Sequence, residues 1–494
     1  MGDYKHGAYG IINAVGVRAA NESSGVIVYV GTAPVHTLEG GASNVNKPVL
    51  VNNIGEARAY FGYSDNWADY TLCEAMYVHL ENKGIGPIVM INVLDPVAHK
   101  ASQGGSASIT PVNGKLTIAS AGSIILDSVV IKTKDETPVT KVKGTDYTIS
   151  YDWTRQVITA TELTAGALGT AELAVTYDLI NPASVTSADV IGSTDGLGLN
   201  KGMYAVKDVY QVTEHIPAFL AAPGFSSVPA IHSAMYENSV KINGHWDAYM
   251  FVDLPIVNGS TPLTFDTIKA YKDANGFTKE NESVYFPLAL GVDGKKYHIS
   301  VLAAANFQDL LSQHGGIPFN SASNTECALI ENLYLGEAYL DRIFDDYIIN
   351  AKLNKNGINS AAYVGGRWAI WGAHSADYSQ TNADSINVAE TNRMMLYYIS
   401  NDFQHRRTFN IDKPTTPNDL VGIIIEEQRR LDALLQIGAL IFGEVILNSD
   451  YKARTDILNG DFSFMFRVTT TPLAKSLTAI VTWVDDGFAT YFVE

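Results

Sequence analysis

The sequence of 494 residues predicts a mixed α/β (α+β) fold, with helices packed on core sheets, an inserted all-β, sandwich-like domain and extended terminal β arms. Three observations predict it. Two continuous apolar runs, Gly25–Gly31 and Pro87–Leu94, flank helical patterns. Residues 97–186 change to short alternating segments rich in Thr and Val, and after them strand and helix patterns alternate again.

The two apolar runs are typical of strands buried on both faces, as in parallel sheets. Between them, Asn53–Phe61 predicts a short helix and Tyr70–Asn82 a longer one, which Gly84 ends. The second helix places four side chains along one face, those of Cys73, Met76, Tyr77 and Leu80. Strand, helix and strand at this spacing form a βαβ unit, which predicts a mixed or parallel sheet.

Residues 97–186 predict an inserted all-β domain. Asn113-Gly114 is a hairpin turn signal between Ser108–Val112 and Lys115–Ala119. A second hairpin is expected from Asp146–Tyr151 and Gln156–Thr161, with Tyr147, Ile149 and Tyr151 alternating onto one face.

After residue 186 the α/β rhythm resumes. Strands are expected at Ile216–Ala222, Ala248–Leu254, Val284–Val292, Gly443–Leu447, Phe462–Thr470 and Ser476–Val484. Helices are expected at Val228–Val240, Thr264–Ala274, Glu326–Ala351, Val388–Arg406 and Pro417–Ala439. The domains expected from these patterns are an arm (1–24), an α/β core (25–96 and 187–380), the insertion (97–186), a C-terminal α/β domain (381–475) and a C-terminal linking strand (476–494).

Composition limits the classes of function. The net charge is −18, from 52 acidic against 34 basic residues, without clustered cations, so nucleic acid is not expected as a ligand. Charged residues make up 17%, below the roughly 25% of ordinary globular chains, and 26 residues are Tyr. Such a surface indicates burial against partner proteins, and an ordinary large enzyme with a big core is the alternative.

Targeting and membrane signals are also missing from the sequence. No uninterrupted apolar stretch of about 18 residues occurs, and the start, MGDYKHGAYG, does not resemble a secretory signal. Two distant cysteines, Cys73 and Cys327, indicate a reduced compartment and core packing. We therefore expect a protein made in the cytoplasm, with neither disulfide nor membrane insertion.

Motifs for nucleotide or metal chemistry are missing. There is no GxxxxGK[ST] loop and no HExxH, and Pro87 breaks the glycine fingerprint that starts at Gly84. Gly196–Gly202 has one residue too many between its last two glycines and predicts a loop. His405 lies beside Arg406 and Arg407 at a helix end, where cations favour the dipole. Asp189, Asp195 and Asn200 do not have the spacing of a calcium loop.

The sequence also contains no arrangement of residues suited to hydrolytic catalysis. No GxSxG elbow exists, and Cys73 and His79 would both have to leave a packed helix face to act as nucleophile and base. The adjacent carboxylates Asp345-Asp346 and Glu426-Glu427 diverge by about 100° on a helix, so solvated faces are the better interpretation. We expect no enzyme, no cofactor and no metal.

Short segments in a fixed order nevertheless span nearly the whole chain outside the insertion. The front contains Asp3–Gly7, Gly25–Ala33, Asn46–Leu50 and Pro87–Val93, and the middle contains Val190–Gly196, Pro217–Gly224 and Gly366–Gly372. The C-terminal series is the strongest, with Arg393, Arg406-Arg407, Asp412–Pro414, the helix near Asn418, Gly438, Leu458–Gly460, Thr471-Pro472 and Ser476–Val484. In order and spacing the chain resembles contractile-tail sheath proteins of phages, bacteriocins and related injection machines. The insertion departs from compact members of that family.

The resemblance implies a structural polymer of the virion tail, assembled in the host bacterial cytoplasm. Its subunits would stack as hexameric rings around a tail tube protein, with the 381–475 domain facing the tube, and would contact baseplate and tail terminator proteins. Contraction would drive the tube through the target envelope. A tail tube or capsid-type subunit is the alternative.

The terminal arms would join neighbouring subunits by strand addition. For these strands we expect inter-subunit contacts at Tyr9, Ile11, Ile12, Thr478, Ile480, Thr482 and Val484. The segment Thr478–Val484 is β-branched on both faces and so favours strand neighbours on either side.

Overall fold

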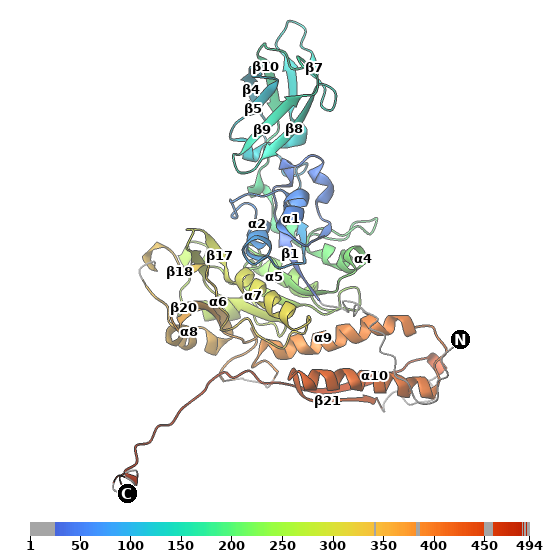
Figure 1. Cartoon of the computed structure of the whole chain (residues 1–494), viewed down its shortest axis with the longest axis vertical. Helices are drawn as coiled ribbons and strands as arrows, with labels where there is room; N and C mark the ends of the chain where they lie inside the picture. Colours follow the sequence, from blue (N-terminus) through green and yellow to red (C-terminus); the bar gives the residue numbers. More distant parts are fainter. Residues whose placement is uncertain are drawn as a thin grey trace, which may run out of the picture. The chain divides into compact units, whose positions relative to one another are not determined.

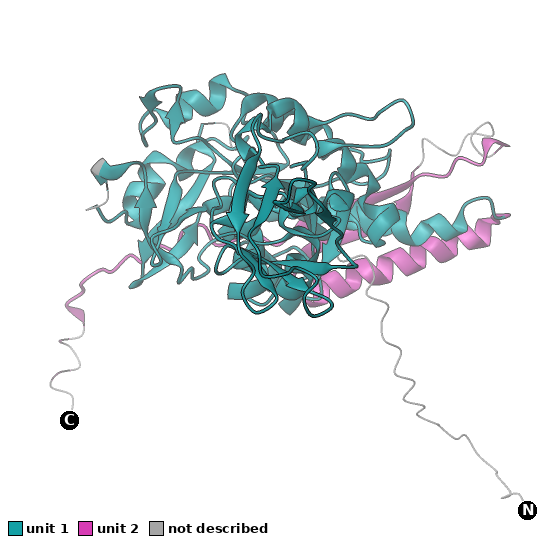
Figure 2. Ribbon diagram, turned by 90° about the horizontal axis from the view of Figure 1, so that it is seen from above, with its two compact units in different colours: residues 1–413 teal, residues 414–494 magenta. Residues whose placement is uncertain are grey.

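A computed structural model describes residues 25–339, 342–381, 386–448, 458–486, 488 and 491. The chain divides into two compact units, which meet in sequence between Lys413 and Pro414 (Figure 2). Within the described ranges no helix combines the length and apolar character needed to cross a bilayer.

An eight-stranded sheet forms the core of the first unit (Figure 1). Its order is β2 (Pro48–Val51), β3 (Ile88–Asn92), β1 (Val26–Gly31), β11 (Pro217–Ala221), β12 (Tyr249–Asp253), β15 (Glu282–Tyr285), β19 (Ile358–Val364) and β20 (Arg367–Trp371). The six inner strands run parallel, and β2 and β20 at the edges are antiparallel to their neighbours. Every residue of β1, β3 and β12 is buried, as their apolar runs predict.

The βαβ unit between β1 and β3 is confirmed. α1 (Ile54–Phe61) begins at Asn53, whose side chain accepts a hydrogen bond from the Glu56 N–H at 3.0 Å. The predicted helix over Tyr70–Asn82 is α2 (Leu72–Ala75) continuing into the π-helical η3 (Met76–Asn82). At its end the Lys83 N–H bonds to the Val78 carbonyl, five residues back, at 3.2 Å.

Helices of the later half are mostly where the pattern predicts them. α5 (Pro229–Glu237), α6 (Ile268–Ala274) and α9 (Glu390–Arg407) match the predicted helices. The structure also contains α3 (Ser187–Ile191), α4 (Val209–Thr213) and α7 (Ile299–Gln313), for which no prediction was made.

Two predictions in this region are wrong. The helix expected over Glu326–Ala351 is instead strand β18 (Ile330–Tyr334) followed, after a connection, by the short α8 (Asp346–Lys352). Gly336 at φ +106° separates them, a conformation that a helix excludes.

The strand expected over Val284–Val292 is instead two strands, β15 and β16 (Leu288–Gly291), which belong to different sheets. Pro287 lies between them and has no N–H to continue a ladder. β16 pairs with β18 and with β17 (Lys296–His298).

Residues 97–186 form two small sheets. One contains β4 (Gly105–Ile109), β10 (Leu173–Tyr177), β6 (Val130–Thr133) and β7 (Thr140–Lys141), and the other contains β5 (Lys115–Ile118), β9 (Val157–Glu162) and β8 (Tyr147–Asp152). Their inward side chains, among them Leu116, Ile131, Tyr147, Ile158 and Val175, share one apolar cluster. β8 and β9 form the predicted hairpin.

The Asn113-Gly114 turn is present, with both residues at positive φ, and the Val112 N–H bonds to the Lys115 carbonyl at 2.8 Å. The predicted hairpin is limited to this antiparallel bridge between Val112 and Lys115, because β4 and β5 belong to different sheets.

The two ends of this region are bonded to each other. The Ala101 N–H donates to the Leu179 carbonyl and the Asn181 N–H to the His99 carbonyl, both at 2.8 Å. Side chains also join the region to the α/β core. The Trp153 ring lies edge-on to Tyr63 at 4.9 Å, and the Arg58 guanidinium lies 4.7 Å from the Trp153 ring.

The second unit contains α10 (Pro417–Gln436), β21 (Leu440–Leu447) and β22 (Phe464–Thr470), all close to their predicted positions. α10 begins with a capping box in which the Thr416 hydroxyl accepts from the Asp419 N–H, and the Asp419 carboxylate accepts from the Thr416 N–H.

Candidate assembly interface

The hairpin of β21 and β22 is antiparallel, with Glu444 opposite Arg467. The Asn448 N–H donates to the Ser463 carbonyl. In an antiparallel ladder the backbone N–H and C=O of alternate residues point to the same neighbour, so at this end the even-numbered residues of β21 direct theirs toward β22. Gly443 and Val445 therefore direct their backbone groups away from β22.

Those outward groups are held by one side chain of α10. The Gln428 Nε2 donates to the Gly443 carbonyl, and its Oε1 accepts from the Val445 N–H, both at 3.0 Å. The amide thus substitutes for a neighbouring strand at this point. The helix can approach closely because Gly443 has no side chain, and a Cβ there would lie 3.1 Å from the Leu431 Cβ. A strand added opposite Gly443 and Val445 would have to displace Gln428.

The C-terminal segment contrasts with this satisfied edge. Residues 471–484 form neither helix nor strand within the chain. The linking strand expected over Ser476–Val484 would pair with other subunits, so it stays a prediction. Its apolar side chains are almost fully exposed, with Leu477, Ile480 and Val481 at 91%, 90% and 92%. Trp483 is 77% exposed. So large a run of exposed apolar side chains indicates a contact surface.

Four of the seven expected contact residues lie in this segment. Thr478, Ile480, Thr482 and Val484 are all exposed, and no secondary structure within the chain includes them. Tyr9, Ile11 and Ile12 lie outside the described residues. The contact of all seven residues with neighbouring subunits stays a prediction.

The place where open α/β sheets usually bind ligands is filled by protein. Strand order changes direction between β1 and β11, and ligands typically bind beyond the carboxyl ends of such strands. Here Thr71 occupies the space, since a Cβ on Gly31 would lie 2.4 Å from its Oγ1 and a Cβ on Gly224 would lie 2.8 Å from its Cγ2. Both glycines are thus needed for packing.

A buried ion pair lies beside this position. His298 Nδ1 lies 2.6 Å from the Glu74 carboxylate, which also accepts from the His298 N–H. Burial lowers the pKa of His298, but the Glu74 and Asp253 carboxylates outweigh it and raise the pKa to about 9. Asp253 in turn accepts hydrogen bonds from the N–H and hydroxyl of Ser300, at the start of α7. These partners lie far apart in the sequence, so no motif indicated them.

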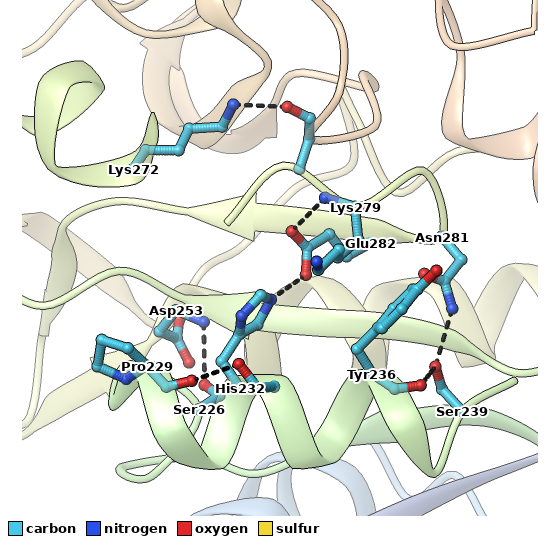
Figure 3. Close-up of polar contacts among 12 residues, drawn as sticks. Ser226, Pro229, His232, Tyr236, Ser239, Asp253, Lys272, Lys279, Asn281 and Glu282 are labelled. Carbon is cyan, nitrogen blue, oxygen red and sulfur yellow. Dashed lines mark hydrogen bonds and ion pairs between the residues drawn. The ribbon is translucent and has the colours of Figure 1, made fainter. Parts of the chain in front are cut away.

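A second buried pair fixes α5 on the sheet (Figure 3). His232 Nε2 lies 2.5 Å from the Glu282 carboxylate, with the two side chains 1% and 0% exposed. The other Glu282 oxygen accepts from the Lys279 N–H at 2.9 Å, and the His232 ring packs 4.3 Å from Phe277. A substrate cannot reach either group, so the pair is structural.

The structure also shows the surroundings of residues that the sequence analysis considered as catalytic candidates. Cys73 is buried, as predicted, and burial raises the pKa of its thiol to about 12. His79 bonds to the Tyr29 hydroxyl and the Gln308 carbonyl, and burial lowers its pKa to about 4. Glu427 is only 1% exposed, so the solvated face predicted for it is wrong. The described residues contain no cluster of three or more His, Cys, Asp or Glu side chains that could hold a metal ion.

The comparisons identify the kind of fold. A chain of the anti-feeding prophage baseplate in its contracted state aligns with a TM-score of 0.53 and 11% identity, over 97% of this chain and 99% of that one. The sheath tail protein of Desulfitobacterium hafniense aligns with a TM-score of 0.50 and 12% identity, over 94% of this chain and 100% of that one. The fold is that of contractile-tail sheath proteins.

A curated relative supports the resemblance in sequence. The tail sheath protein of Burkholderia phage BcepMu is 29% identical over 258 residues, 51% of this chain and 49% of that protein. The match thus spans about half the length of the relative. No family model matches the sequence. The resemblance to contractile tail sheath proteins is confirmed.

Proposed function

We propose that this chain is the sheath subunit of a contractile tail or injection system, a structural protein of the virion tail and not an enzyme. The observation that carries the proposal is an alignment of nearly the whole chain with sheath folds, combined with an exposed apolar C-terminal segment. A chain that exposes such a segment requires a partner surface, and a polymer of identical subunits supplies one at every position.

Assembly in this proposal uses strand addition. The segment containing Thr478, Ile480, Thr482 and Val484 pairs with a neighbouring subunit, together with the N-terminal strand containing Tyr9, Ile11 and Ile12. Since Gln428 holds Gly443 and Val445, the added strands do not pair with that stretch of β21. Hexameric rings stack around an inner tube, which residues 381–475 face, and contraction drives the tube through the target envelope. The tube, baseplate and tail terminator proteins are the further partners.

Residues 97–186 form in this proposal an inserted all-β domain on the outer surface. Two observations support it: the region has its own apolar cluster, and its two ends are bonded together. Insertion at such a junction leaves the order of the core strands unchanged.

Electron microscopy of the purified full chain tests the function. We expect hollow helical tubes in negative stain at tens of micromolar protein, formed without a cofactor. Discrete particles of monomer size at that concentration, with and without moderate salt, would contradict the proposal.

A further inference from the structure

Residues 97–186 contact the α/β core at more places than their two linkers. We call this contact the seam. Its members are His36, Glu39, Gly40, Arg58 and Tyr63 of the core and Gly122, Asp127, Lys143 and Trp153 of residues 97–186. Parts of a chain that share only linkers and a small contact move relative to one another by default. The seam therefore decides whether residues 97–186 swing or stay fixed.

The first contact of the seam is charged. Lys143 Nζ lies 3.1 Å from the Glu39 carboxylate of the core and 3.2 Å from the Asp127 carboxylate. The other Asp127 oxygen accepts a hydrogen bond from the Gly40 N–H at 2.8 Å. Burial lowers the pKa of Lys143, but the two carboxylates outweigh it and raise the pKa, so the ammonium stays charged at neutral pH. Asp127 and Lys143 thus each bond to the core, and a swing would break both bonds.

The second contact is buried. His36 is 2% exposed, and its Nε2 lies 2.9 Å from the Gly122 carbonyl. Since a carbonyl only accepts, Nε2 carries the ring proton. Burial lowers the pKa of His36 to about 4, so the ring is neutral at neutral pH and Nε2 holds its only N–H. Ile125, three residues after Gly122, packs in the main core cluster. A directional bond and an apolar anchor therefore lie side by side in the sequence.

The third contact is aromatic. The Trp153 ring lies edge-on to Tyr63 at 4.9 Å and 4.7 Å from the Arg58 guanidinium. Arg58 is itself held by an ion pair with Glu81 of η3, at 2.7 Å. The core thus presents a fixed cation and a fixed ring to Trp153, and contacts of both kinds depend on the orientation of the ring.

We propose that the seam locks residues 97–186 to the α/β core in one orientation, so that the two move as a single body. The three contacts come from separate segments, at 122–127, 143 and 153, and differ in chemistry, so no single opening event releases all of them. One consequence rests on the proposed sheath function. A rotation of the core would carry the far end of the locked region with it, and successive subunits would present these regions in a regular array.

Pulsed double electron–electron resonance on the full chain tests the proposal, with spin labels at Ser150→Cys on β8 and Ser233→Cys on α5. Both serines are exposed. Cys73 and Cys327 are buried, and burial raises the pKa of their thiols to about 12 and about 11, so only the introduced cysteines take the label. Dilution into an excess of unlabelled chain restricts the signal to distances within one chain. We expect one narrow distance peak.

Lys143→Met should broaden this peak, and adding Trp153→Ala should broaden it further. The matched control is Lys134→Met, because Lys134 forms its 2.8 Å ion pair with Glu172 inside residues 97–186 and takes no part in the seam. It should leave the width unchanged. Glu39→Gln changes only an exposed residue on the core side and serves as a second, milder variant that should also broaden the peak.

A second label pair reports folding. Ser108→Cys on β4 with Ser150→Cys on β8 lies wholly within residues 97–186 and should give the same peak in every variant. A broad distribution for the first pair before any seam residue is changed would overturn the proposal. So would an unchanged width in Glu39→Gln and in Lys143→Met with Trp153→Ala. Failure of the chain to form tubes would count against the proposed sheath function and not against the seam, because these distances are measured within one chain.

Discussion

Gln428 on α10 completes the backbone hydrogen bonding of Val445 on β21, with its Oε1 3.0 Å from the Val445 nitrogen. The Gln428 side chain thus makes the hydrogen bonds that a neighbouring strand would otherwise make with β21. It ties the helix to the hairpin by polar bonds as well as by apolar contacts, and it allows a direct test.

Gln428→Leu should destabilise the second unit, because it leaves two backbone groups unsatisfied. We expect a loss of about 1–3 kcal/mol in the free energy of unfolding. Amide hydrogen exchange should show faster exchange at Val445, and Gln436→Leu on the exposed end of the same helix should leave it unchanged. Protection at Val445 that survives Gln428→Leu would contradict the role assigned to the amide.

Ile480→Pro with Thr482→Pro should abolish tubes while leaving the dilute chain as stable as before. Both side chains are exposed and neither residue lies in a strand of its own chain, so proline removes donors that only a neighbour would use. Thermal melting and negative-stain microscopy measure the two effects. The control Ile480→Thr with Thr482→Val keeps both donors and the β-branched side chains. A lower melting temperature with tubes retained would show that the segment belongs to its own subunit.

Replacing residues 97–186 by a short Gly-Ser linker should leave the α/β core folded and able to polymerise, but less stable. Ile125 and Ile180 pack within the main core cluster. Removing each of these side chains should lower the free energy of unfolding by about 1.5–3 kcal/mol, the amount that its burial contributes. Melting curves and microscopy of the deletion variant measure this. An insoluble variant, or a folded one that forms no tubes, would contradict the claim that the core folds and assembles without the inserted domain.

Trp153→Ala should loosen the contact of the insertion with the core without unfolding either. The edge-on contact with Tyr63 and the cation–π contact with Arg58 each contribute about 0.5–1.5 kcal/mol. Limited proteolysis should then cut faster near residues 97 and 186. Trp153→Phe, which keeps an aromatic ring, should lose less protection, and equal loss in both variants would rule out the ring contacts as the cause.

The His298–Glu74 pair predicts a loss of stability at alkaline pH. Because folding raises the pKa of His298 from 6.5 to about 9, its contribution is complete below about pH 6.5 and disappears as the pH rises through 9. The change should be about 1–3 kcal/mol, since each unit is worth about 1.4 kcal/mol and the side chain is one-fifth exposed. Denaturant unfolding of His298→Gln should lack this slope, whereas the exposed control His245→Gln should keep it.

Sequence periodicity predicted the elements whose environment is simple. β1 and β3 are buried on both faces, and α10 has a single apolar side and a capping box, so each has a clear pattern. α7 was missed because eleven of its fifteen residues are buried, so its sequence lacks the polar stripe of an amphipathic helix. The mistaken helix over Glu326–Ala351 reflects apolar residues whose strand pairing depends on distant β16.

Side-chain partnerships across the fold left no trace in the sequence. The contacts of Gln428 with Val445 and of His298 with Glu74 each depend on how separate elements meet, which no spacing rule encodes. The C-terminal segment is the opposite case. Its β-branched composition predicted a strand, but a strand needs a partner, and its own chain supplies none among the described residues.

The bonded junction at Ala101 and Leu179 has a consequence for the order of folding. β1 must pair with β11, although Val26 and its partner Pro217 are separated by the whole insertion. Closing so long a loop carries an entropy penalty that grows with its length. If residues 97–186 fold first, their joined ends take the length of the insertion out of the loop that must close. The insertion then behaves during synthesis as a kinetic aid, holding β3 and β11 within reach of each other before the central sheet exists.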